Sequence, residues 1–258
     1  MSGFRSEEMI SGLRTANVWL ARLRIQLSAH IIYCSLMSIK SIRTIHTTQT
    51  VTPESELITP HLSWYKGRNQ KQIEHIFKKH EIIPDLLDEA PQYEFKFRWV
   101  GQIWPDFGTK HHPEELKFTP FAFKFPAIPN VLYSFFMFDL DSPSRKNATK
   151  RSYIHWGLAN MLKYNILLCE TLAKYVGPFP EKGTGPHRYV FLIYKQPFSP
   201  HANFTVHYTE PRMPQPDRDD PQRANWDLRK IVKKYKLEGP VAGNFLYSEW
   251  APPLEEYP

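Results

Sequence analysis

The stretch YVGPFPEKGTGPHRYVFLIYKQ, residues 175–196, combines a proline- and glycine-rich loop with a strand-like segment. Its second half is an almost continuous apolar run, which is typical of a strand covered on both sides. Its first half is a proline-rich loop in which Gly183 and Gly185 allow a tight turn with exposed backbone N–H groups, a geometry that favours anions. His187 and Tyr189 are two positions apart, so we expect them on one face of the strand. No GK[ST] follows the glycines, so the loop is not a P-loop.

Other segments also predict strands. YEFKFRWV, residues 93–100, alternates strictly between aromatic and charged side chains, and FAFKF at 121–125 has the same period. VLYSFFMFDLD, residues 131–141, is a near-continuous apolar run ending in two acids, which predicts a central strand with a polar end. Residues 202–209 and 239–250 predict two more strands.

Two segments predict helices. Residues 69–83 carry apolar positions at helical spacing, and Pro84 is expected to end that helix. Residues 225–237 show a second amphipathic pattern, which Gly239 and Pro240 are expected to stop. An aromatic content of 14% and 23 prolines against 11 glycines favour a mainly β domain with long loops.

The chain begins with a stretch of different composition. We predict a basic N-terminal extension over residues 1–66 and a folded domain over residues 67–258. No Asp or Glu occurs between Met9 and Pro53. The apolar part of this stretch is interrupted by Arg22 and Arg24, and central arginines are costly in a bilayer, so no transmembrane span is expected.

Two locations are compatible with this start. An Arg-rich, acid-poor, Ser/Thr-containing segment resembles a mitochondrial transit peptide, although Glu7 and Glu8 depart from that pattern. The alternatives are a disordered extension or upstream sequence before a start at Met37. Cys34 and Cys169 are too few for a disulfide framework and favour a reducing compartment. We expect a cytoplasmic protein, with a mitochondrial location as the alternative. The net charge of +7 fits acidic partners or ordinary solubility.

Three polar residues inside apolar surroundings are candidates for chemistry. Asp139 and Asp141 lie two apart at a strand end, so their side chains are expected on one face. Two carboxylates that close can serve acid–base work, hold a metal or line a hydrogen-bonded pocket, or they can belong to an ordinary turn. His155 lies in SYIHWGLAN and is by itself either a satisfied core histidine or a functional group.

Taken together, DLDSPSR at 139–145, the later IHW and the block at 175–196 resemble the phosphatidylethanolamine-binding protein family. The resemblance runs from about residue 73 to residue 250. It implies a mainly β fold with a large central antiparallel sheet, a second smaller sheet and short peripheral helices. It also implies that the acidic strand end and the glycine loop line one cavity.

The family's small anion pocket accepts phosphate or phosphorylethanolamine-type headgroups. Carried over by motif, its ligand-binding residues would be Asp139, Asp141, His155, Pro180, His187 and Tyr189. The resemblance implies no catalytic residue, cofactor or metal. Two positions depart from the family pattern, because Leu140 replaces the proline of its D-P-D motif and Phe179 stands where a small residue is usual. A bulky Phe179 is expected to narrow the pocket.

These observations predict a non-enzymatic protein that binds phosphate or phospholipid headgroups and modulates kinase or protease partners. Binding is expected to weaken when the histidines lose their protons. The alternative is a structural component of the mitochondrial large ribosomal subunit, in contact with ribosomal RNA or proteins. An enzyme is the third hypothesis, and it lacks an activated Ser or Cys nucleophile in the motif cluster.

Overall fold

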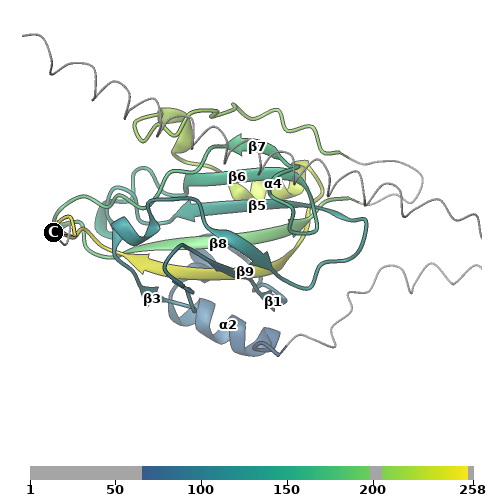
Figure 1. Cartoon of the computed structure of the whole chain (residues 1–258), viewed down its shortest axis with the longest axis horizontal. Coiled ribbons are helices and arrows are strands. Elements are labelled where there is room, and N and C mark those ends of the chain that lie inside the picture. The colour runs from purple at the N-terminus through teal and green to yellow at the C-terminus, as the bar shows by residue number, and fades with distance from the viewer. Residues whose placement is uncertain (1–65, 198–204, 255–258) are drawn as a thin grey trace, which may run out of the picture. The chain divides into compact units, whose positions relative to one another are not determined.

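The computed structural model describes residues 66–197 and 205–254, so nearly all of the predicted extension lies outside the described residues. In the described part, the large sheet has seven strands, in the order β1-β9-β8-β5-β6-β7 with β3 also on β9, and β2 and β4 form a small second sheet (Figure 1). The strands are β1 Tyr93–Glu94, β2 Lys96–Arg98, β3 Thr109–Lys110, β4 Phe121–Lys124, β5 Leu132–Asp139, β6 Tyr153–Leu162, β7 Glu170–Ala173, β8 His187–Lys195 and β9 Glu238–Ser248. The helices are α2 Gln70–Lys79, α3 Ile82–Asp85 and α4 Leu228–Lys234, with single 3₁₀ turns at Pro113–Leu116, Arg145–Asn147 and Pro221–Arg223.

The mainly β architecture with a second small sheet is confirmed, and one detail of it differs. Strands β9, β8, β5, β6 and β7 pair antiparallel, but the short strands β1 and β3 pair with β9 in parallel. The large sheet is therefore mixed. Strand β5 lies between β6 and β8, and every residue in it after Leu132 is buried, as its continuous apolar run predicts.

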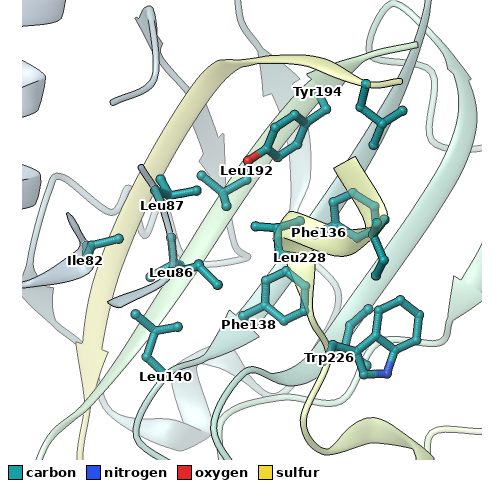
Figure 2. Packing of buried hydrophobic residues seen from close by; sticks show 14 of the residues in the cluster. Ile82, Leu86, Leu87, Phe136, Phe138, Leu140, Leu192, Tyr194, Trp226 and Leu228 are labelled. Carbon is teal, nitrogen blue, oxygen red and sulfur yellow. The ribbon is translucent and has the colours of Figure 1, made fainter. Parts of the chain in front are cut away.

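The two faces of the large sheet are covered differently. Helices α2, α3 and α4 cover one face, where Phe136, Phe138 and Leu192 pack against Leu86 and Leu228 (Figure 2). The small sheet covers the other face with its aromatic side chains. The buried residues of this second cluster include Phe95, Phe97, Trp99, Phe123, Phe125, Phe135 and Phe191. Both faces of β5 and β8 are dry, so a polar group on either strand needs a partner within the protein.

The structure differs from the sequence-based predictions at two helix ends and at one predicted strand. The first helix begins after the Asn69 cap but ends at Lys79, because Glu81 adopts a left-handed φ of 56°, and Pro84 lies in the short α3. Gly239 and Pro240 belong to β9 and do not stop α4, which ends at Lys234. Residues 205–209 form no strand.

Candidate functional site

The strands β5, β6 and β8 bring the predicted site residues to one end of the sheet. Asp139, the last residue of β5, is the pairing partner of Tyr189 on β8 and of Tyr153 on β6. His187 begins β8, and its Nδ1 lies 2.8 Å from Asp139 Oδ2. The acidic strand end and the glycine-loop strand, 48 positions apart in the chain, are therefore in direct contact.

A β-bulge places His155 beside these residues. Met137 pairs with Trp156, whereas the next residue of β5, Phe138, pairs with Ile154. His155 is thus the extra residue of the bulge, an irregularity that re-aims a side chain. Its ring centroid lies 5.1 Å from that of Tyr189. The structure therefore gathers Asp139, His155, His187 and Tyr189 in one buried cluster, each of them between 0 and 4% exposed.

The glycine loop holds His187 in place. Gly183 and Gly185 adopt φ values of 84° and 80°, in the left-handed region that glycine tolerates best. Between them, the Thr184 hydroxyl donates to the Glu181 carbonyl at 2.8 Å and lies 2.9 Å from His187 Nε2. A hydroxyl has one proton, so Thr184 accepts the hydrogen bond from the histidine.

These contacts favour the protonated form of His187. Its Nε2 donates to Thr184, and its Nδ1 faces the Asp139 carboxylate, which when ionised only accepts. Burial lowers the pKa of His187, but the hydrogen bond and charge of Asp139 outweigh burial and raise this pKa above its ordinary value. A raised pKa means that the pair stabilises the fold fully at low pH. This stabilisation is lost as the pH rises through the pKa of His187 in the folded protein.

Replacing Thr184 with valine is expected to lower the pKa of His187. The variant keeps the shape of the side chain but removes the acceptor at Nε2, which favours the imidazolium. NMR titration of the histidine ring signals measures this pKa directly. Thr184→Ser, which keeps the hydroxyl, is the matched control and is expected to titrate like the wild type. An unchanged pKa in the valine variant would show that Thr184 does not accept from His187.

His155 is neutral under ordinary conditions. Burial lowers its pKa to about 4, although the negative charge of Asp139 opposes the change. Its Nδ1 lies 2.8 Å from the Val176 carbonyl and donates to it. The neutral ring therefore presents Nε2 as an acceptor, and His155 does not serve as a protonated donor to an anion near neutral pH.

Tyr189 links the cluster to the proline-rich loop. Burial raises its pKa well above 10, and the nearby Asp139 charge adds to the increase. The pKa of Tyr189 is also influenced by the backbone of Phe179, so the phenol lies between the cluster and the proline-rich loop. The phenol stays protonated.

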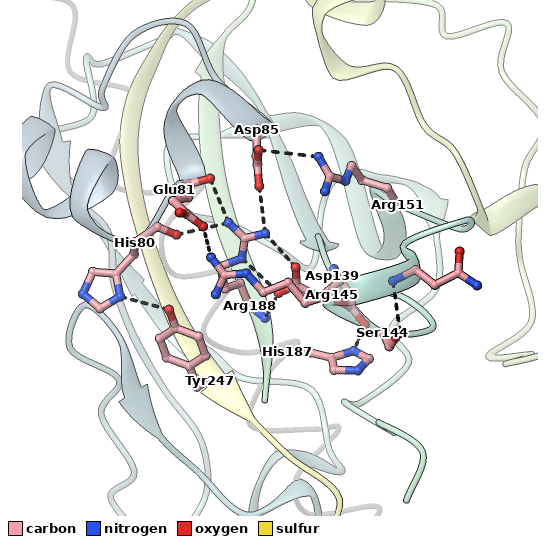
Figure 3. A network of polar contacts seen from close by, with 12 residues as sticks. His80, Glu81, Asp85, Asp139, Ser144, Arg145, Arg151, His187, Arg188 and Tyr247 are labelled. Carbon is pink, nitrogen blue, oxygen red and sulfur yellow. Dashed lines mark hydrogen bonds and ion pairs between the residues drawn. The ribbon is translucent and has the colours of Figure 1, made fainter. Parts of the chain in front are cut away.

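Asp141 does not share the environment of Asp139. Its Oδ1 accepts from Arg188 Nη2 at 2.6 Å, and its Oδ2 accepts from Arg188 Nε and from the Arg188 backbone N–H, both at 2.9 Å. The same guanidinium donates to Asp85 and to the carbonyls of His80 and Glu81 (Figure 3). The expectation that both acids present one face to a cavity therefore fails for Asp141. The chain turns after Asp139, and a fully buried arginine occupies both oxygens.

Phe179 lies between the buried cluster and solvent. A groove of about 410 Å³ is lined by the loop from Gly177 to Lys182, by Arg218 and by Trp250, but not by the four clustered residues. Phe179 lines this groove, and its ring centroid lies 5.4 Å from that of His155. Pro180 is on the rim of the same groove. In this conformation the Phe179 ring packs against His155, on the side of the cluster that faces the groove.

Sequence reasoning missed two cations of this region. Arg188 lies within a predicted strand, and a charged residue within an apolar run signals a buried partner. Arg218, from a loop with no motif, places its guanidinium 5.1 Å from the Phe179 ring centroid. Nothing in the sequence indicates that contact. The ligand-binding role of the six residues named from the sequence remains a prediction.

The described residues contain neither a group of metal-ligating side chains nor a membrane-spanning helix. Among residues 66–197 and 205–254, no three His, Cys, Asp or Glu side chains converge as metal ligands would. Within the same residues, the helices are too short or too polar to cross a bilayer.

The chain has a mixed sheet, a groove at the ends of its strands and a buried Asp–His pair beside that groove. These features are typical of a mainly β binding protein. The family model described as phosphatidylethanolamine-binding protein matches residues 77–246. A relative from Drosophila melanogaster, "Putative odorant-binding protein A5", is 32% identical over 182 residues, which is 70% of this chain and 82% of the relative. The chain belongs to the phosphatidylethanolamine-binding protein family.

Solved structures show the same fold. The carboxypeptidase Y inhibitor, in a crystal structure with its cognate proteinase, aligns with a TM-score of 0.57 and 24% identity over 70% of this chain and 96% of its own. The phosphatidylethanolamine-binding protein from Plasmodium vivax aligns with a TM-score of 0.54 and 20% identity over 71% of this chain and 98% of its own. None of these relatives is a ribosomal protein, so they give the ribosomal alternative no support.

Proposed function

We propose that this chain binds a small phosphate-type anion, such as a phosphorylethanolamine headgroup, in the groove beside Phe179. The observation that carries the proposal is a pair of cations on that groove. Lys182 Nζ lies 4.8 Å from the Trp250 ring centroid, and the Arg218 guanidinium stacks on Phe179. Among the described residues, no carboxylate forms an ion pair with either of them, whereas Lys117 on the same groove pairs with Glu114. Both charges are thus held in position and available to an anion.

The buried cluster has a different part in this proposal. His187 and Asp139 neutralise each other, and His155 is neutral, so the cluster adds little positive charge. The His155 Nε2 is an acceptor and suits a protonated phosphate oxygen or an ammonium group. The anion is therefore neutralised by Lys182 and Arg218, and the cluster contributes only when Phe179 moves aside. The pKa of His155 is lowered to about 4, so of the two histidines only His187, whose pKa is raised, can contribute a positive charge near neutral pH, which weakens the expected pH dependence of binding.

Removing the two groove cations is expected to weaken the binding of phosphorylethanolamine about thirtyfold or more. Each charge-assisted contact contributes about 1 kcal/mol or more when it is partly shielded from water. Calorimetric titration of the Lys182→Ala/Arg218→Ala variant measures the loss. The control is Lys71→Ala/Lys79→Ala, which removes the same charge from exposed positions of α2 on the other side of the sheet. Equal weakening in both variants would mean that only net charge matters, and no binding by the wild type would reject the proposal.

Regulation of a protein partner is a second part of this proposal. The carboxypeptidase Y inhibitor shares the fold, and that protein was solved with a proteinase. A protease is accordingly the partner class that we propose to test first, ahead of a kinase. We also propose a cytoplasmic location, with the mitochondrion as the alternative that fractionation of the full chain would decide.

A further inference from the structure

The connection between β6 and β7 exposes apolar side chains that the fold does not use. It runs from Leu162 to Cys169 with the sequence LKYNILLC, and we call it the β6–β7 tip. Leu167 and Leu168 are 85% and 78% exposed, and Leu162 and Tyr164 are 44% and 47% exposed. Scattered exposed leucines are ordinary, but two adjacent leucines with more than three quarters of their surface in water form a continuous apolar point.

The inward-facing side chains of the β6–β7 tip already pack against the rest of the protein. Ile166 and Cys169 pack against the aromatic cluster of the large sheet, and Tyr164 makes an edge-to-face contact with Phe125. The Leu167 backbone N–H donates to Asn165 Oδ1 at 3.0 Å. The two leucines therefore point outward because the residues around them are fixed, so no rearrangement of the loop is needed to expose them.

We propose that the β6–β7 tip inserts into the surface of an anionic lipid bilayer. Two leucines with most of their surface exposed gain most by entering a fluid apolar phase, since a flat protein surface would leave much of both leucines in water. Tyrosine is favoured at the boundary between acyl chains and headgroups, which is where Tyr164 would lie.

The charge of the tip fits an anionic surface. Residues 162–169 contain no Asp or Glu, and Lys163 lies beside the leucines. Among the described residues, no carboxylate forms an ion pair with Lys163. A lysine close to an anionic bilayer adds about 1 kcal/mol to binding, and the net charge of +7 acts in the same direction.

This docking would leave the groove facing away from the membrane. Leu162 at the tip pairs with Leu132 at the start of β5, whereas Asp139 is at the end of that strand. A strand of this length spans about 25 Å, so the tip and the candidate site lie at opposite ends of the sheet. A tethered chain would therefore keep its groove open to soluble ligands and partners, and the tip does not depend on the proposed anion site.

Co-sedimentation of the full chain with vesicles tests the proposal. The vesicles are phosphatidylcholine mixed with phosphatidylserine at about two to one. The variants compared below share the same groove residues, so a difference between them does not depend on the anion site. Leu167→Asp/Leu168→Asp is expected to bind at least tenfold more weakly than the wild type. The control is Val100→Asp/Phe118→Asp, which changes two other side chains that are 70% and 69% exposed, and it is expected to bind like the wild type.

Measuring how deeply the β6–β7 tip enters the bilayer distinguishes insertion from electrostatic attraction to the membrane surface alone. A Tyr164→Trp variant adds one fluorophore at the tip, and its added emission is expected to be quenched by lipids brominated near the headgroup. Equal vesicle binding by the wild type and the Leu167→Asp/Leu168→Asp variant would overturn the proposal. So would a change of oligomeric state without vesicles in that variant, because the leucines would then contact a second copy.

Discussion

Replacing Arg188 with methionine is expected to lower the free energy of unfolding by about 3–5 kcal/mol. The guanidinium is fully buried and donates to Asp141, Asp85 and the carbonyls of His80 and Glu81. Methionine fills a similar volume but leaves the fully buried Asp141 carboxylate without a cation. An unpaired buried charge costs more than the pair contributes, so the loss greatly exceeds that of a surface ion pair.

Urea denaturation measures this loss, and two further variants interpret it. Arg145→Met removes an ion pair with Glu81 whose partners are 39% and 65% exposed, so it is expected to cost at most about 1 kcal/mol. Adding Asp141→Leu to Arg188→Met removes the stranded carboxylate and is expected to recover at least about 1 kcal/mol. A double variant less stable than Arg188→Met alone would contradict the explanation by an unpaired charge.

Replacing Phe179 with alanine is expected to tighten the binding of phosphorylethanolamine about tenfold. The ring covers His155, so its removal lets the ligand reach the acceptor Nε2 and the wall of the buried cluster. One additional hydrogen bond to a charged ligand contributes about 1.5 kcal/mol, which is roughly a factor of ten. The substitution keeps the Phe179 backbone, which Tyr189 contacts.

Calorimetry with NMR detection of the histidine signals measures the effect. Phe179→Leu is the control, because it loses the ring under Arg218 as the alanine variant does but keeps a bulky side chain over His155. Weaker binding than in the alanine variant and unchanged His155 signals are expected. In the alanine variant, ligand should shift the His155 signals. An affinity equal to that of the wild type, with no shift at His155, would show that the ligand uses the groove cations alone.

The pattern of apolar and polar residues along the chain was sufficient to predict most of the strands. The continuous apolar run before Asp139 indicated a strand covered on both faces, and β5 is buried between two covering layers. The same reasoning failed at residues 205–209. Val206 and Tyr208 alternate and are buried, but that segment has no hydrogen-bonded neighbour strand. Burial of side chains produces the pattern, whereas a strand also requires a partner for its backbone.

The predicted end of the first helix was wrong for a related reason. Its periodicity continues past Lys79, yet the chain turns at Glu81 and directs the carbonyls of His80 and Glu81 to Arg188. A buried guanidinium has five donors to satisfy, and this requirement outweighs local helical preference. The arginine lies more than one hundred positions away in the chain, so no local window contains the cause.

Periodicity was enough to predict the fold class, because alternating and continuous apolar patterns are local properties of the chain. The motifs indicated the family, and the resemblance to that family implied that the acidic strand end meets the glycine loop. Only the packing of the strands determines which polar side chains are available to a ligand. The packing pairs Asp141 with Arg188, raises the pKa of His187, makes His155 a neutral acceptor and places the Phe179 ring against His155. Charge state and access depend on burial and on distant partners, and both arise only when the strands are packed together.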